Sequence, residues 1–125
     1  MIIKQVSVFL ENKTGILLEL VKTLGDNNIN ISALSIAENA EYGIARMIVD
    51  DTDSAVIKLK AAGYQVNIAD VICVETPDEP GELAKALADF SQKEINVSYM
   101  YGYSNDGIAR LIMKVSHPEE AAKML

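Results

Sequence analysis

An internal repeat constrains the fold of this chain more than any other feature of its sequence. Placing Gly15 over Gly81 also places the dipeptide at 29–30, Ile-Asn, on the Ile-Asn at 95–96. Farther along, a two-residue deletion aligns the identical segments 43–46 and 107–110, both Gly-Ile-Ala-Arg. Apolar positions also coincide: Leu17 with Leu83, Val21 with Leu87, and Leu24 with Phe90. The chain is therefore expected to contain two copies of one supersecondary unit.

Each copy is predicted to have the same order of elements. Apolar residues alternate as in half-buried strands, or recur at i, i+4 and i+7 as on one helical face. Thr52 and Asp53 are the expected caps of the second helix. In the first copy these patterns predict strand 3–10, helix 14–26, strands 29–37 and 43–50, a helix from 52 to about 62, and a short strand 64–66. In the second copy they predict strand 70–76, helix 80–93, strands near 95–103 and 107–115, and a helix from 118 to 125.

This order predicts an α+β fold of two ferredoxin-like βαββαβ units in tandem, residues 1–68 and 69–125. Each unit is expected to have an antiparallel sheet with helices on one face. The second unit lacks its last strand, which would lie beside the strand around Ile72 and Val74. Sheet edges are rarely left bare, so we expect either a longer natural chain or a homodimer partner to cover this edge.

Composition excludes several classes of partner. The formal charge of −7 and the pI of about 4.6 disfavour nucleic acid, because an acidic surface repels phosphate. No apolar run approaches the roughly 20 residues of a membrane helix. The single cysteine, Cys73, cannot form an internal disulfide, which favours a reducing, cytoplasmic setting.

Two motifs resemble those of the ACT-domain family, and of its tandem amino-acid-binding members in particular. Each motif is a strand, a short polar loop ending in glycine, a helix, and an Asn-Ile or Asn-Val entry into the next strand. They stand at 11–17 with 30–31 and at 77–83 with 96–97, and the first departs from the usual Pro-Gly by having Thr14 before Gly15. The resemblance implies a module that binds a free amino acid where two ACT units meet. We also expect a homodimer, because the units are small.

The resemblance also implies the binding residues. A helix N-terminus offers unpaired N–H groups to a carboxylate, and glycine allows close approach to the backbone. Asn can bond an amino or a carboxylate group, whereas Asp holds an ammonium and repels a carboxylate. One predicted site joins Asn12, Thr14, Gly15 and Ile16 to Asn96, and the other joins Asp78, Gly81 and Glu82 to Asn30.

Structural roles compete with binding at most of these positions. Asn12 and Asp78 are also candidates for helix caps, and Asn30 and Asn96 suit turns. Arg46 and Arg110 are expected at the same strand position, where ion pairs with nearby acids are favoured over a ligand carboxylate. Tyr99, Tyr101 and Tyr103 alternate, so they are expected on one side of their strand, in a packed surface or a pocket.

Nothing in the sequence predicts catalysis or a cofactor. With His117 as the only histidine and one cysteine, no usual metal cluster or Ser-His-Asp set can be proposed. The leading hypothesis is a stand-alone sensor of an amino acid. The alternative is a regulatory subunit that docks on a metabolic enzyme, because residues 7–12 look like the opening of the acetolactate synthase small subunit. A purely structural dimerisation unit is the third possibility.

Overall fold

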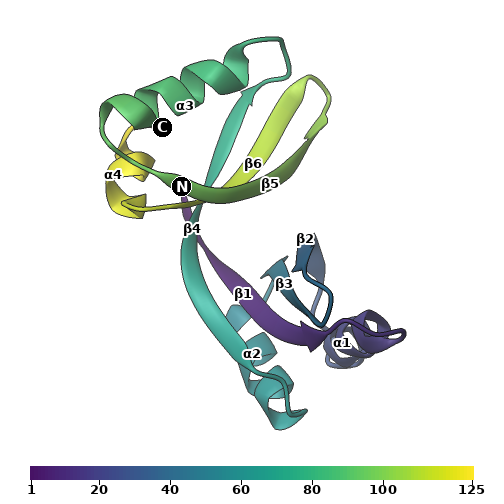
Figure 1. The fold of residues 1–125 in the computed structure, drawn as a ribbon. Helices are drawn as coiled ribbons and strands as arrows, with labels where there is room; N and C mark the ends of the chain where they lie inside the picture. The colour runs from purple at the N-terminus through teal and green to yellow at the C-terminus, as the bar shows by residue number, and fades with distance from the viewer. The chain divides into compact units, whose positions relative to one another are not determined.

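The computed structural model describes residues 1–125, which form two units (Figure 1). The first unit comprises Lys4–Ala69, and the second comprises Asp70–Leu125 together with Met1–Ile3. The elements are β1 (Ile2–Glu11), α1 (Ile16–Asp26), β2 (Ile31–Glu38), β3 (Tyr42–Val49), α2 (Thr52–Ala61), β4 (Val66–Pro77), α3 (Glu82–Gln92), β5 (Val97–Asn105), β6 (Ile108–Val115) and α4 (Pro118–Lys123).

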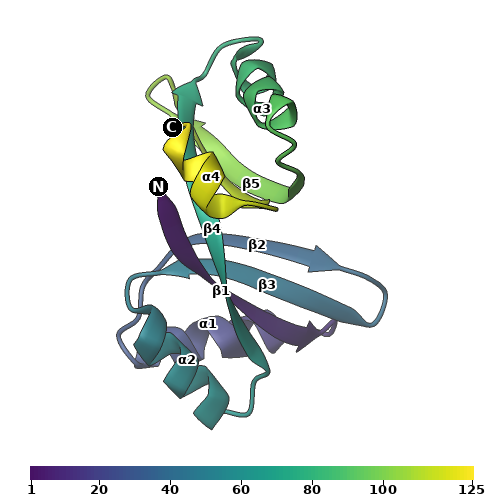
Figure 2. The ribbon, with the colours of Figure 1, turned by 90° about the vertical axis from the view of Figure 1, so that its left-hand side faces the viewer.

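The first unit is an antiparallel sheet in the order β2-β3-β1-β4, to which β4 contributes only its start. Alternation along β1 places Val6 and Val8 on one face. Both are fully buried there with Leu24 of α1 and Leu59 of α2. Figure 2 shows α1 and α2 together on one side of β1, β2 and β3. This arrangement confirms the predicted ferredoxin-like unit.

The second unit repeats this arrangement in the order β1-β4-β6-β5, with only the start of β1 taking part. Its core contains Ile72 and Val74 of β4, Met113 of β6, Phe90 of α3 and Ala121 of α4. Because Ile72 and Val74 alternate on one face of β4, both helices pack on the same side of the sheet. The second unit therefore has a core of its own, and no strand follows α4.

Part of the expected bare edge of the second unit is paired by the chain's own first residues. The backbone N–H of Cys73 donates to the carbonyl of Met1 at 2.9 Å. In the first unit, the N–H of Phe9 donates in the same way to the carbonyl of Gln65 at 3.1 Å, just before β4 begins. At Cys73 this edge is therefore paired by β1, which begins in one unit and continues in the other, and the expectation of a bare edge is corrected there. A homodimer stays a prediction.

The strands correct the predicted alignment of the two copies. Val6 pairs with Met47 in the first unit, and Ile72 pairs with Met113 in the second. Val6 is as far along the chain from Ile72, and Met47 from Met113, as Gly15 is from Gly81. The two copies therefore align without a deletion. The identical segments 43–46 and 107–110 therefore do not occupy matching positions in the two units. Arg110 pairs across from Glu75, whereas Arg46 pairs across from Ser7, so the two arginines are not at equivalent positions.

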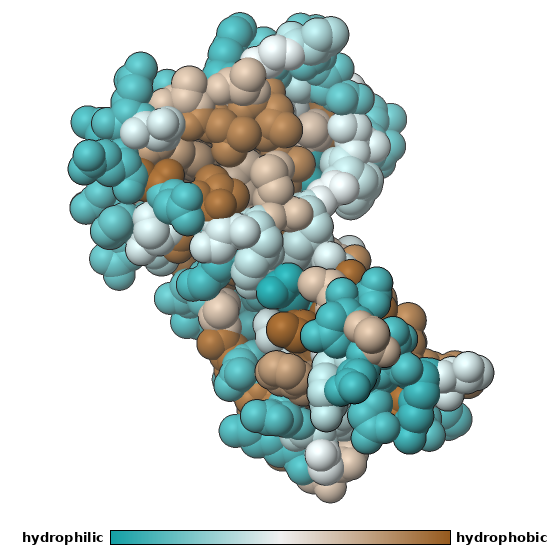
Figure 3. Space-filling view, viewed as in Figure 1, coloured by the Kyte–Doolittle hydropathy of each residue, from teal (hydrophilic) through white to brown (hydrophobic).

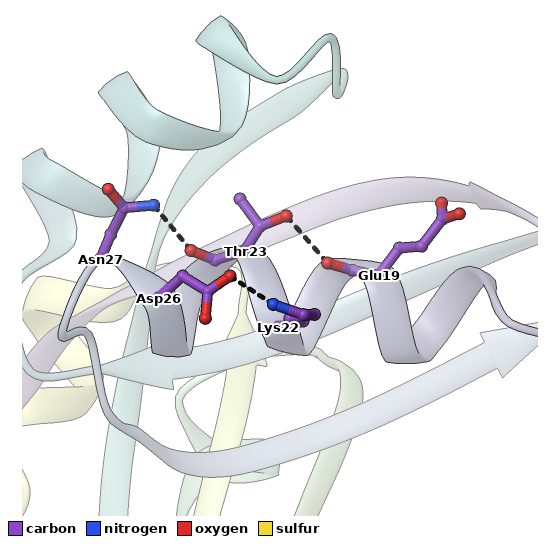
Figure 4. Close-up of polar contacts among 5 residues, drawn as sticks. All are labelled: Glu19, Lys22, Thr23, Asp26 and Asn27. Atoms are coloured by element: carbon purple, nitrogen blue, oxygen red, sulfur yellow. Dashed lines mark hydrogen bonds and ion pairs between the residues drawn. The ribbon is translucent and has the colours of Figure 1, made fainter.

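Two further sequence expectations are corrected. The short strand at 64–66 and the strand at 70–76 are one continuous strand, β4. Leu17 and Val21 of α1 are partly exposed, and the buried positions of this helix are Leu20 and Leu24. On the outer side of α1, Lys22 pairs with Asp26 at 2.7 Å, and Thr23 and Asn27 bond to backbone carbonyls one turn earlier (Figure 4).

The cap of α2 is Asp51 rather than Thr52 or Asp53. The Asp51 carboxylate accepts a hydrogen bond from the N–H of Ser54 at 3.0 Å. We expect Asp51→Ala to lower the free energy of unfolding by about 0.5–2 kcal/mol, because the helix loses this acceptor. Urea unfolding of Asp53→Ala is the control, since the N-cap of this helix is Asp51. Equal losses in both variants would show that charge near the helix, rather than the cap, sets the effect.

Candidate functional site

Both strand-to-helix loops end in a left-handed glycine. Gly15 has φ 89° and Gly81 has φ 88°, and each is the N-cap of the following helix. A Cβ at either position would meet nothing within 4 Å, so the backbone conformation, rather than space, calls for glycine. No side chain caps either helix. The alternative role of Asn12 and Asp78 as helix caps is therefore wrong.

A hollow lies beside each loop, at matching positions of the two units. In the first unit it has a volume of about 110 Å³. In the second unit the volume is about 260 Å³. Lining residues matched by the strand register are Leu10 and Thr76, Glu11 and Pro77, Asn12 and Asp78, Lys13 and Glu79, Leu17 and Leu83, Ile36 and Gly102, Glu38 and Ser104, and Gly43 and Ala109.

The polar side chains of the first loop are bonded within the unit. The Asn12 side-chain amide donates to the carbonyl of Asn39 at 3.2 Å, and its backbone N–H donates to the carbonyl of Glu41 at 2.9 Å. The Lys13 ammonium lies 3.4 Å from the Glu11 carboxylate. Ile16 lines the hollow and packs against the core, whereas Thr14 is exposed.

The second loop keeps the backbone contact but not the side-chain ones. The N–H of Asp78 donates to the carbonyl of Gly107 at 2.9 Å. The carboxylates of Asp78 and Glu79 make no hydrogen bond or ion pair, and both residues are exposed. The Glu82 carboxylate pairs with Lys85 at 3.0 Å and so faces along the helix surface. The second loop thus presents two free carboxylates at the rim of its hollow.

Asn30 and Asn96 lie at the far end of their own units from the glycines. A helix of 11 residues separates Gly15 from Asn30, a distance of about 16 Å along the axis. The backbone N–H of Asn30 donates to Asp50 at 3.0 Å, and that of Asn96 donates to Ser116 at 2.9 Å. These bonds fit the turn role weighed from the sequence. The pairing of Asn96 with Asn12, and of Asn30 with Asp78, stays a prediction.

Residues of β5 complete the second hollow, and the motif search did not select them for the site. Gly102 and Ser104 line it together with Tyr103. A Cβ on Gly102 would collide with the backbone carbonyl of Arg110, so the two strands require glycine there. A glycine in the middle of a predicted strand, beside the tyrosines considered for a pocket, was the available signal. Figure 3 shows apolar surface on the second unit below α3. Leu83 and Leu111 contribute apolar side chains to the lining of the hollow.

The remaining candidates differ in their surroundings. Arg110 lies 3.5 Å from Glu75, in accord with the ion pair favoured from the sequence. Tyr103 is exposed and lines the second hollow, which fits the pocket role considered from the sequence, whereas Tyr99 and Tyr101 are partly buried. No group of three or more His, Cys, Asp or Glu side chains is placed to hold a metal ion. None of the four helices has the length and apolar character needed to cross a bilayer.

Comparison with known proteins identifies the fold. No curated protein matches the chain. The crystal structure of protein BT0572 from Bacteroides thetaiotaomicron is 43% identical, covers 100% of this chain and 87% of its own, and has a TM-score of 0.95. The ligand-free regulatory subunit of aspartate kinase from Thermus thermophilus is 13% identical over 98% of this chain and 93% of its own, with a TM-score of 0.74. The corresponding Thermus flavus subunit is also 13% identical, over 98% and 92%, with a TM-score of 0.71. The model of the family described as "ACT domain pair" matches residues 1–125, and the chain therefore belongs to this family.

Proposed function

We propose that this chain is a non-catalytic regulatory module that binds a free amino acid beside a strand–glycine–helix loop. The observation that carries the proposal is the hollow found at this loop in both units of an ACT domain pair. The hollow combines an apolar floor with a few polar groups, as small-molecule sites do.

The chemistry of the loop suits a zwitterion. The N–H of Ile16 donates to the carbonyl of Lys13 at 3.4 Å, and that of Glu82 donates to the carbonyl of Glu79 at 3.2 Å. The next N–H groups of α1 and α3 have no partner within their helices, and they lie at the positive end of the helix dipole. These groups favour a carboxylate. Asp78 and Glu79 favour an ammonium group on the other side of the second loop. An α-amino acid carries both charges on adjacent atoms, which matches this arrangement.

A thermal-shift screen of the free amino acids tests the proposal. An amino acid present at about 100 times its dissociation constant should add about 2.7 kcal/mol to the free energy of unfolding, because it binds only the folded state. Isothermal calorimetry on the best ligand then gives its affinity and stoichiometry. If no amino acid shifts the midpoint, and none gives a heat of binding, the proposal is wrong.

A regulatory subunit that docks on a metabolic enzyme is the second candidate. It is favoured by the fold shared with the regulatory subunit of aspartate kinase, which this chain matches over nearly all of its length. Co-purification of the tagged chain with a catalytic subunit from its own cells would raise this candidate above a stand-alone sensor. The homodimer and the cytoplasmic location stay predictions from the sequence.

A further inference from the structure

We infer that the two hollows are not equivalent, and that only the hollow of the second unit takes the amino acid, with its ammonium group at Asp78 and Glu79. This inference rests on the proposed function and adds to it a stoichiometry of one ligand per chain. It also adds a specificity, because amino acids with acidic side chains are excluded.

The first reason is space. The second hollow has a volume of about 260 Å³ against about 110 Å³ for the matched hollow of the first unit. A separate hollow of about 300 Å³ in the first unit also touches Leu10, Glu11 and Ile16, but it opens toward Tyr64 and does not include Asn12. Ile36 occupies the first hollow at the position where the second has Gly102, and Leu10 stands where the second has Thr76. A branched apolar side chain thus fills room that is open in the second unit. The backbone of Arg110 excludes any larger residue at Gly102, so this opening is fixed by the pairing of β5 with β6.

The second reason is that the polar side chains of the first loop already have partners, whereas the carboxylates of the second loop do not. A ligand at the first loop would have to displace the bond from Asn12 to Asn39 and the ion pair of Lys13 with Glu11. At the second loop, Asp78 and Glu79 have no such partners to lose. Their charge is already exposed at the rim, so an ammonium group gains an interaction there without breaking one.

The third reason is the sign of the charge. The matched position of Lys13 is Glu79, so the second rim carries two negative groups and no lysine, whereas Lys13 stands with Glu11 and Glu38 at the first hollow. A ligand carboxylate is accommodated only at the first-turn N–H groups of α3. A second carboxylate, as in glutamate or aspartate, has no positive partner and is repelled by Asp78 and Glu79. Neutral and basic amino acids avoid this cost.

Filling each hollow separately tests the stoichiometry. Ser104 and Glu38 are exposed, matched positions at the end of β5 and β2, so tryptophan at either should be tolerated by the fold. Calorimetry with the amino acid found in the screen should show one site per chain in the parent protein. We expect S104W to lose measurable binding and E38W to keep both affinity and stoichiometry. Circular dichroism and thermal unfolding of both variants check that they are folded.

The outcomes separate this inference from the proposed function. Binding that survives in S104W and is lost in E38W would overturn the choice of hollow and leave amino-acid binding intact. Two sites per chain in the parent protein would overturn the inequality of the hollows. An absence of binding in the parent protein would overturn the proposed function and this inference with it.

Neutralising one rim carboxylate tests the specificity. Asp78→Asn should weaken binding roughly 10- to 150-fold, the loss expected for one hydrogen bond to a charged group. Asp106→Asn removes the same charge from the neighbouring hairpin turn, outside the hollow, and should leave affinity unchanged. Glutamate and aspartate should give no binding heat with the parent protein. Equal effects of the two substitutions, or tight binding of glutamate, would overturn the assigned role of Asp78.

Discussion

Phe90→Ala is expected to lower the free energy of unfolding of the second unit by about 3–5 kcal/mol, the loss typical of a large aromatic side chain removed from a core. Phe90 is 2% exposed and packs in the cluster that contains Ile72 and Met113. Leu24 occupies the matched position in the first unit and is fully buried. Leu24→Ala should cost about 2–5 kcal/mol there.

Hydrogen exchange followed by unit is the measurement that distinguishes the two variants. The two core clusters share no residue, so each substitution should lower protection most in its own unit. Leu18→Ala is the control, because this side chain is 69% exposed, and it should change stability by less than about 0.5 kcal/mol. Identical protection patterns for Phe90→Ala and Leu24→Ala would mean that the chain has one cooperative core rather than two.

Gly102→Ala is the second substitution with a large expected effect. Its added Cβ would collide with the carbonyl of Arg110, and a backbone atom cannot move aside as a flexible side chain can. The strands must therefore separate locally, at a cost of about 1–3 kcal/mol in the free energy of unfolding. The same shift changes the wall of the second hollow, so ligand affinity should fall as well.

Gly43→Ala is the control for Gly102→Ala. Gly43 also lies on a hairpin strand and lines a hollow, but its Cβ would meet its nearest atom, the carbonyl oxygen of Ala37, at 3.6 Å. This is an ordinary contact, so only a small loss of stability is expected. Urea unfolding at equal protein concentration compares the two variants. If both lose the same free energy, the close approach of β5 to β6 at Gly102 is not the cause.

Local sequence patterns determined the elements and their order. The repeat around Gly15 and Gly81 predicted two copies of one unit, and the family match and strand order confirm the predicted fold. These features are local, because helical and strand periodicities depend on residues a few positions apart. The left-handed glycines before α1 and α3 follow from the same local motif, and they located one wall of each hollow.

Register was decided by pairing between distant segments. The identical segments 43–46 and 107–110 suggested a deletion, yet the partners of Val6 and Ile72 show that the shift between the copies stays constant. A displacement by an even number of positions keeps every side chain on its own face of a strand, so the hydrophobic pattern alone cannot detect it. Only the hydrogen-bonded partners along β1 and β4 determine the alignment.

The tertiary structure also decided which edge was covered and how large each hollow became. The bond from Cys73 to Met1 joins a residue of the second repeat to the first residue of the chain, and no local sequence pattern predicts it. Likewise, Gly102 and Ser104 are distant from Asp78 in the sequence and reach its loop only because β5 pairs with β6. Local propensity selects helices, strands and turns, but the shape of a site depends on which distant backbones are brought together, and that is set by packing and strand pairing over the whole unit.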